Sequence, residues 1–248
     1  MKLYVALGIS AGDVVAFAGA GGKSGAILAL SRELKQDGIT ALVVPTTKMF
    51  LREAEEVGPL VISRDVEELG ALIKEALSDS VAVVAGKGLL SKKRVEGVEP
   101  NWVEQLSPLA EVTLVEADGS RRRPLKGTAA HEPALPKAST LVVGVGNIEA
   151  FGKPLNEEYV HRPEVLAELT GLGTGQSITA QAFASALALG TLGKVPKGVK
   201  RAVLITGVEP GKKMSDAAVI TRELWRLGIE KILLTSLPSK QEPQVWLP

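Results

Sequence analysis

The sequence predicts an α/β fold in which helices cover both faces of a mostly parallel sheet. Two observations carry this prediction. Near-continuous apolar runs of strand length alternate with helical stretches along the chain, and one such run enters a glycine cluster that leads directly into a helix. The chain has 248 residues, 45% of them hydrophobic, which is enough for one large core. We expect a single domain over residues 1–248, with an inserted loop region around 119–163.

The expected strands are short apolar runs, mostly bounded by glycine, proline or polar residues. They cover residues 14–18, 40–44, 59–63, 81–85, 112–119, 141–146, 201–206 and 231–234. The expected helices carry their apolar residues on one face or end near glycine. They cover residues 3–9, 25–36, 65–77, 101–109, 163–169, 179–189 and 215–227. The tail from Ser236 is rich in proline and is expected to be irregular.

The glycine cluster has the pattern GxxGKS, which is typical of a phosphate-binding loop. Glycines allow backbone N–H groups to face an anion, and the following helix adds free donors and the positive end of its dipole. Lysine supplies charge for the outer phosphates, and the adjacent hydroxyl can ligate Mg²⁺. We expect a P-loop NTPase-like three-layer sandwich whose nucleotide-binding residues are Gly19, Ala20, Gly21, Gly22, Lys23 and Ser24. The alternative is a tight strand-to-helix turn with an incidental lysine.

The loop differs from the longer form GxxxxGK[ST], which would need glycine where Phe17 stands. The short form is similar to the loops of Mur-type ligases and related ATP-dependent enzymes. Thr46 and Thr47 follow the next strand, where their hydroxyls or amides would reach a terminal phosphate or its metal. An ordinary turn explains these two threonines equally well.

Two acidic residues, Glu116 and Asp118, close the apolar strand predicted over 112–119. Ligands of parallel sheets bind at the carboxyl ends of the strands, where a carboxylate can hold the Mg²⁺ of a nucleotide. Strand alternation places both side chains on one face, so they would converge on one ion. We expect Ser24 and Asp118 to hold the metal, and Lys23, Glu116 and Asp118 to be catalytic. The alternative for Asp118 is a turn residue before Gly119.

A run of cations follows the acidic pair, and arginine forks match phosphate and carboxylate groups. The chain's two histidines lie in nearby loops and are candidate bases or ligands. The expected substrate-binding residues are Arg121, Arg122, Arg123, Lys126, His131, Glu132, His161 and Arg162. They would hold an anionic substrate. The alternatives are a solvated basic loop and structural histidines.

Composition excludes several classes of function. Lys and Arg number 29 against 28 Asp and Glu, so the net charge of +1 argues against a nucleic-acid or membrane surface. The absence of cysteine excludes disulfides, thiolate metal sites and a cysteine nucleophile. No apolar run reaches the ~18 residues of a membrane span, and the start does not look like a signal peptide. We expect a cytoplasmic protein.

Several motifs occur together in an order that resembles one family. They are residues 19–24 (GAGGKS), 46–48 (TTK), 115–121 (VEADGSR), 124–126 (PLK), 131–133 (HEP) and 160–163 (VHRP). Over roughly residues 1 to 235, the chain looks like the YqeC family, described as accessory or cofactor-biosynthesis proteins for selenium-dependent molybdenum hydroxylases. The resemblance implies a P-loop-type protein that uses ATP or GTP with Mg²⁺ in hydroxylase maturation, with an anionic cofactor precursor and the hydroxylase as partners.

The chain departs from that family's pattern at two points. Pro45 stands where members often carry the first of three threonines, and Thr206 and Gly207 replace an Asn-Lys or Asn-Gln pair. The second departure leaves the base open. Beside an NTP-dependent enzyme, the open alternatives are a nucleotide-switched carrier or chaperone with little turnover, an ATP-dependent ligase similar to Mur ligases or dethiobiotin synthetase, and a scaffold with a relic loop.

Overall fold

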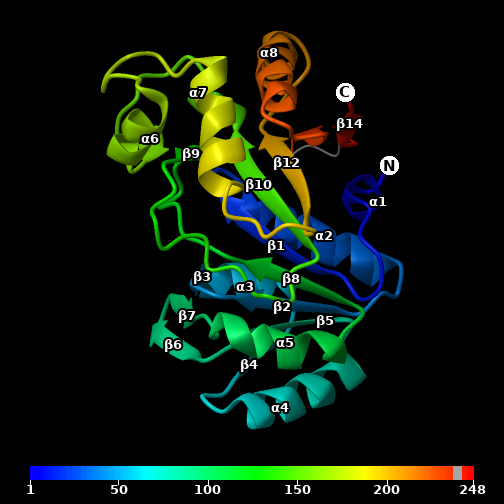
Figure 1. Cartoon of the computed structure of the whole chain (residues 1–248). Coiled ribbons are helices and arrows are strands. Elements are labelled where there is room, and N and C mark those ends of the chain that lie inside the picture. Colours follow the sequence, from blue (N-terminus) through cyan, green and yellow to red (C-terminus); the bar gives the residue numbers. More distant parts are fainter. Residues whose placement is uncertain (237–241) are drawn as a thin grey trace.

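The computed structural model describes residues 1–236 and 242–248, whose central feature is a nine-stranded sheet (Figure 1). Across the sheet the strands are β14 (Gln244–Trp246), β13 (Lys231–Thr235), β12 (Lys200–Thr206), β10 (Leu141–Asn147), β1 (Val14–Gly19), β8 (Val112–Glu116), β2 (Ala41–Pro45), β5 (Ala82–Gly86) and β4 (Leu60–Ile62). Neighbouring strands are parallel except β13 and β14. The glycine cluster follows β1, in the middle of the sheet.

Helices cover both faces of this sheet, which confirms the predicted fold class. One face carries α1 (Leu3–Leu7), α2 (Lys23–Gln36) and α3 (Leu51–Val57). The other carries α4 (Val66–Asp79), α5 (Val103–Leu106), α6 (Pro163–Thr170), α7 (Ala180–Ser185) and α8 (Lys212–Arg226). Alternate side chains of β1 enter the two cores: Val15 and Phe17 face α2, whereas Ala16 and Ala18 face the other side.

Short elements complete the structure. Turns of 3₁₀ helix span Pro100–Trp102, Ser107–Leu109 and Ile148–Ala150, and a π-helical turn spans Ala186–Thr191. An antiparallel sheet is formed by β3 (Lys48–Phe50), β7 (Arg94–Glu96) and β6 (Gly88–Ser91). A parallel pair joins β9 (Leu125–Lys126) to β11 (Val160–His161). These strands were not expected, because runs of two to four residues carry little periodic signal.

Three expectations about elements need correction. The strand predicted over 112–119 ends at Glu116, so Asp118 lies beyond it. The helix predicted over 179–189 changes to the π-helical turn after Ser185. The tail is not irregular throughout, because β14 pairs with β13 and places Trp246 opposite Ile232. Residues 237–241 of the tail lie outside the described residues. The one-domain organisation stays a prediction.

None of the helices within residues 1–236 and 242–248 combines the length and apolar character needed to cross a membrane.

Candidate functional site

The glycine loop, residues 19–24, joins the end of β1 to the first turn of α2. Gly19, Gly21 and Gly22 have φ angles of 99°, 70° and 135°, a region that side-chain-bearing residues rarely adopt. Gly22 is the N-cap of α2 and, being glycine, has no side chain that could cap the helix. Within residues 1–236 and 242–248, the first amides of α2 therefore have neither an intrahelical acceptor nor a capping side chain, so they can bind an anion.

Close packing against two strand ends explains why the loop needs glycine. A Cβ atom added at Gly21 would lie 2.5 Å from the Cβ of Asn147 and 2.6 Å from the carbonyl oxygen of Pro124. A Cβ at Gly22 would lie 2.9 Å from the Cγ2 atom of Thr206. The Thr206 hydroxyl also donates a hydrogen bond to the Gly21 carbonyl. The ends of β10 and β12 therefore hold the loop in shape.

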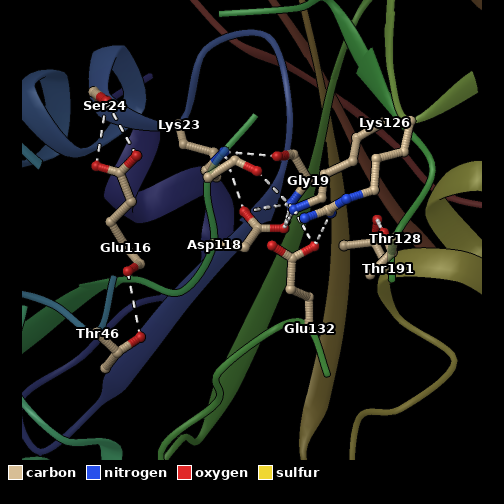
Figure 2. Close-up of polar contacts among 12 residues, drawn as sticks. Gly19, Lys23, Ser24, Thr46, Glu116, Asp118, Lys126, Thr128, Glu132 and Thr191 are labelled. Atoms are coloured by element: carbon tan, nitrogen blue, oxygen red, sulfur yellow. Dashed lines mark hydrogen bonds and ion pairs between the residues drawn. The ribbon is translucent and has the colours of Figure 1, made fainter. Parts of the chain in front are cut away.

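Lys23 folds back over this loop (Figure 2). Its Nζ atom donates to the Gly19 carbonyl at 2.6 Å and lies 3.1 Å from the Oδ1 atom of Asp118. The Gly19 amide donates to the same carboxylate, at 3.1 and 3.0 Å to its two oxygens. The expected proximity of Lys23 and Asp118 is thus present. Lys23 is 4% exposed and Asp118 is fully buried, so this ion pair is shielded from water.

Asp118 has a second cationic partner, which begins a chain of buried ion pairs. The Lys126 ammonium lies 2.8 Å from Asp118, donates to the Gly119 carbonyl at 2.7 Å and lies 2.8 Å from Glu132 (Figure 2). Arg162 then pairs with Glu132. We call Asp118, Lys126, Glu132 and Arg162 the ion-pair chain. Both oxygens of Asp118 have partners in it or in the glycine loop, and its expected role as a metal ligand stays a prediction.

The charges of the ion-pair chain shift the pKa of Glu132, which belongs to it, and of the neighbouring His161. Burial tends to raise the pKa of Glu132, but hydrogen bonds from Lys126 and Arg162 outweigh this and lower it. Burial and the positive charge of Arg162 and Lys126 lower the pKa of His161 to about 4. His161 is therefore neutral near pH 7. A neutral imidazole can accept a proton, but here its basicity is weak.

On the other side of the loop, Ser24 faces Glu116 (Figure 2). The Ser24 hydroxyl lies 3.3 Å from each carboxylate oxygen of Glu116. Glu116 is 7% exposed, and burial, opposed by the charge of Lys23, raises its pKa to about 7. A carboxyl with this pKa exchanges a proton near neutral pH. Glu116, not Asp118, is the acidic residue that contacts Ser24.

The two threonines after β2 differ in their hydrogen bonds. Thr46 donates its amide to the Glu116 carbonyl at 3.0 Å and its hydroxyl to the Ala134 carbonyl at 2.9 Å. The Thr47 hydroxyl is buried and has no hydrogen-bond partner within the part of the chain that the structure describes. An orphaned buried hydroxyl is unusual and leaves Thr47 free to meet a ligand atom. Among the described residues, no local contact assigns either threonine to phosphate.

The remaining basic residues point in different directions. Arg121 and Arg122 are exposed and have φ angles of 49° and 60°. The guanidinium of Arg122 lies 4.3 Å from the centre of the Phe50 ring, whereas Arg123 is half-buried. His131 is exposed in its loop. The expected substrate-binding set is therefore divided between the ion-pair chain and the surface.

Sequence reasoning missed several residues that shape this site. Asn147 ends β10 beside the glycine loop, and its position at the carboxyl edge was the available signal. Thr206 was expected only at the base-reading position, whereas its side chain also packs against the glycine loop. Lys194 had no such signal. Its ammonium donates to the carbonyls of Ala129, Ala130 and Glu132 at 2.7, 2.8 and 2.8 Å, which holds the loop containing Glu132.

Few side chains that could ligate a metal lie together in the part of the chain that the structure describes. The described residues contain no group of three or more His, Asp or Glu side chains suited to a metal ion. Ser24 and Glu116 supply two adjacent oxygen ligands, which suits Mg²⁺ because that ion keeps several waters and takes further oxygens from phosphate.

Comparisons with known proteins identify relatives. Residues 15–164 match the model of a family described as YqeC protein. The chain is 30% identical over 225 residues to "Uncharacterized protein YqeC" of Escherichia coli strain K12, covering 89% of this chain and 86% of that protein.

Solved structures show weaker likeness. Signal recognition particle 54 kDa protein from Aeropyrum pernix K1, in complex with GDP, gives a TM-score of 0.44 at 14% identity, covering 94% of this chain. Chloroplast FtsY from Physcomitrella patens gives 0.35 at 12% identity, covering 89% of this chain. The chain spans 43% and 58% of the lengths of those two structures.

Proposed function

This chain belongs to the YqeC family, and on that premise we propose that it binds a nucleoside triphosphate with Mg²⁺ at the glycine loop. The observation that carries the proposal is the pairing of uncapped amides at the start of α2 with the buried ammonium of Lys23. Free amides, a helix dipole and a lysine together form a receptor for an anion. In this role Lys23 leaves the Gly19 carbonyl and neutralises the outer phosphates.

We assign the metal to the Ser24 side of the loop. Ser24 and Glu116 are adjacent oxygen ligands, and Mg²⁺ prefers oxygen. Mg²⁺ held there would offset the negative charge of the phosphates. Asp118 holds Lys23 and the Gly19 amide in position, and Glu116 in its ionised form would supply a carboxylate ligand to the ion. Asp118 as a direct ligand, the arrangement expected from the sequence, is the competing assignment.

The wider role follows from the family resemblance. We propose ATP or GTP as the nucleotide and maturation of the cofactor of a selenium-dependent molybdenum hydroxylase as the process. Thr206 and Gly207 occupy the position that reads guanine in many GTP-binding proteins, and Thr206 bonds to the glycine loop here. These residues do not form the guanine-reading pattern, so the proposal includes both ATP and GTP. Capture of the hydroxylase by the immobilised protein, with and without nucleotide, tests the partner and separates an enzyme from a nucleotide-switched carrier.

Lys23→Ala tests the nucleotide site. The substitution removes the phosphate-facing charge, while Asp118 keeps Lys126 as a buried partner. We expect the affinity for Mg²⁺-ATP or Mg²⁺-GTP, measured by isothermal titration, to fall at least about tenfold. Lys35→Ala is the matched control, because Lys35 is exposed in the last turn of the same helix. Equal affinity in the wild type and Lys23→Ala, with circular dichroism showing both folded, rejects the proposal.

A further inference from the structure

An open cleft of about 670 Å³ adjoins the metal side of the glycine loop. It begins at Ser24 and Gly25 in the first turn of α2 and continues between α3 and the turn that links β6 to β7. Phe50 forms an aromatic part of the wall, and Arg122 reaches it from the loop after β8. The cleft is large enough for a small organic molecule.

The walls of this cleft carry opposite charges. Lys92 and Lys93 in the β6–β7 turn and Arg122 on the facing loop supply three cations. No ion pair joins any of these three to a carboxylate within residues 1–236 and 242–248. The α3 wall carries Glu53, Glu55 and Glu56, and Glu56 is paired with Arg52 and Arg32. The unpaired cations therefore lie on the two loops that face α3.

Arg122 is held in a defined orientation. Its guanidinium carbon lies 4.3 Å from the centre of the Phe50 ring, and that of Arg94 lies 3.6 Å from the same ring. Stacking on an aromatic ring restrains a guanidinium while its edge N–H groups stay available to a carboxylate or phosphate. The backbone of Arg122 adopts a φ of 60°, an uncommon conformation for a residue with a side chain.

The cationic wall is also anchored to α3. Phe50 pairs with Arg94 across β3 and β7, and the Leu51 amide donates to the Lys93 carbonyl at 3.0 Å. These backbone contacts fix the spacing between Lys93 and the start of α3. A preformed site of this kind binds a ligand without ordering a mobile segment.

We propose that this cleft binds the second substrate, a small organic molecule bearing a phosphate or carboxylate that contacts Arg122, Lys92 and Lys93. The inference rests on the proposed function, because the cleft can hold a second substrate only if the glycine loop binds the nucleotide. Ser24 lines the cleft and also contacts Glu116, so a ligand there lies beside the metal end of that nucleotide. The cleft also distinguishes between two of the expected substrate-binding arginines, since Arg122 lines it and Arg121 does not.

Phenyl phosphate is a suitable probe because it joins one phosphate to one ring, and benzyl alcohol is its uncharged control. Binding is measured by saturation-transfer NMR and isothermal titration, first on the free protein and then with a non-hydrolysable Mg²⁺-nucleotide present. We expect phenyl phosphate to bind under both conditions and Arg122→Ala to weaken it about tenfold or more. Arg121→Ala is the matched control, since it removes the same charge from the adjacent exposed position.

The outcomes separate this inference from the nucleotide proposal. A loss in Arg122→Ala with retained binding in Arg121→Ala and Lys23→Ala supports the cleft, whether or not nucleotide binds. Equal losses in Arg121→Ala and Arg122→Ala mean non-specific attraction and overturn it. A loss in Lys23→Ala alone places the probe in the glycine loop and also overturns it, as does the absence of phenyl phosphate binding or equal binding of benzyl alcohol. Nucleotide affinity should be unchanged in Arg122→Ala.

Discussion

The buried carboxyl of Glu116 leads to a pH-dependent prediction for the ligand-free protein. Burial, opposed by Lys23, raises the pKa of Glu116 from 4.5 to about 7. Between these two values the folded protein holds a proton that the unfolded chain has released. The free energy of unfolding therefore falls as pH rises across this window, and the loss is complete above pH 7. Below pH 4.5 the carboxyl is protonated in both states and contributes nothing.

Glu116→Gln removes this titration and keeps a side chain of nearly the same size. The shift in pKa corresponds to roughly 3 kcal/mol when Glu116 is fully ionised. Urea denaturation at pH 5 and pH 8, with EDTA present, gives the free energy of unfolding of both proteins. We expect the stability of Glu116→Gln relative to the wild type to increase by ~2–3 kcal/mol between pH 5 and pH 8. Other titrating groups are common to both proteins, so their effects cancel in this comparison.

Glu75→Gln is the control for the loss of one carboxylate, because Glu75 is exposed in the middle of α4. Its relative stability should change little between the two pH values. If the Glu116→Gln difference is also the same at pH 5 and pH 8, Glu116 ionises normally in the folded protein. The argument from burial would then be refuted, and with it the exchangeable proton that we assign to the metal side of the loop.

Two further substitutions test the packing of the site. Gly21→Ala combines a φ of 70° with a Cβ 2.5 Å from its nearest neighbour, whereas Gly38→Ala has a φ of 72° and no atom within 4 Å. Backbone strain should lower the free energy of unfolding of both variants by ~1–2 kcal/mol, measured by urea denaturation. Gly21→Ala should lose more stability than Gly38→Ala, and it alone should lose nucleotide affinity. Equal losses of stability in the two variants would contradict the packing argument. Lys126→Met leaves the buried carboxylates of Asp118 and Glu132 short of a partner. It should lower the free energy of unfolding by ~3–5 kcal/mol, and a loss under ~1 kcal/mol would show that the ion-pair chain adds little.

The central sheet could be predicted because its strands have a distinctive composition. β1, β8, β10 and β12 are buried on both faces and read as near-continuous apolar runs. The β3–β7–β6 sheet has no such pattern, since its strands are short and β6 is mostly exposed. β14 follows a proline-rich segment, and its strand conformation depends on pairing with β13. The strand conformation of β14 therefore depends on a tertiary contact that the local sequence does not predict.

The sequence predicted that Asp118 approaches Lys23, but it did not predict that Lys126 also pairs with Asp118. The end of β8 was expected to bring Asp118 toward Lys23, and the two lie 3.1 Å apart. Sequence could not show which cation of the following run turns inward. The positive φ angles of Arg121 and Arg122 change the direction of the chain, so Lys126 is buried against Asp118 while Arg122 reaches the surface cleft. A charge pattern alone does not encode that reversal.

The balance of buried charge favours an anion at the glycine loop independently of the sequence motif. Lys23, Lys126 and Arg162 supply three positive charges to the loop and the ion-pair chain, whereas Asp118 and Glu132 supply two negative ones. Glu116, whose pKa is raised to about 7, adds only part of a negative charge near pH 7. Because Lys23 and Lys126 are nearly buried, water compensates little of the excess. The free amides of α2 add partial positive charge at the same place. A polyphosphate would neutralise this excess and occupy those donors, whereas a cation bound there would increase the repulsion. Within the proposed function, this charge balance favours the other side of the loop for the metal, where Glu116 contacts Ser24.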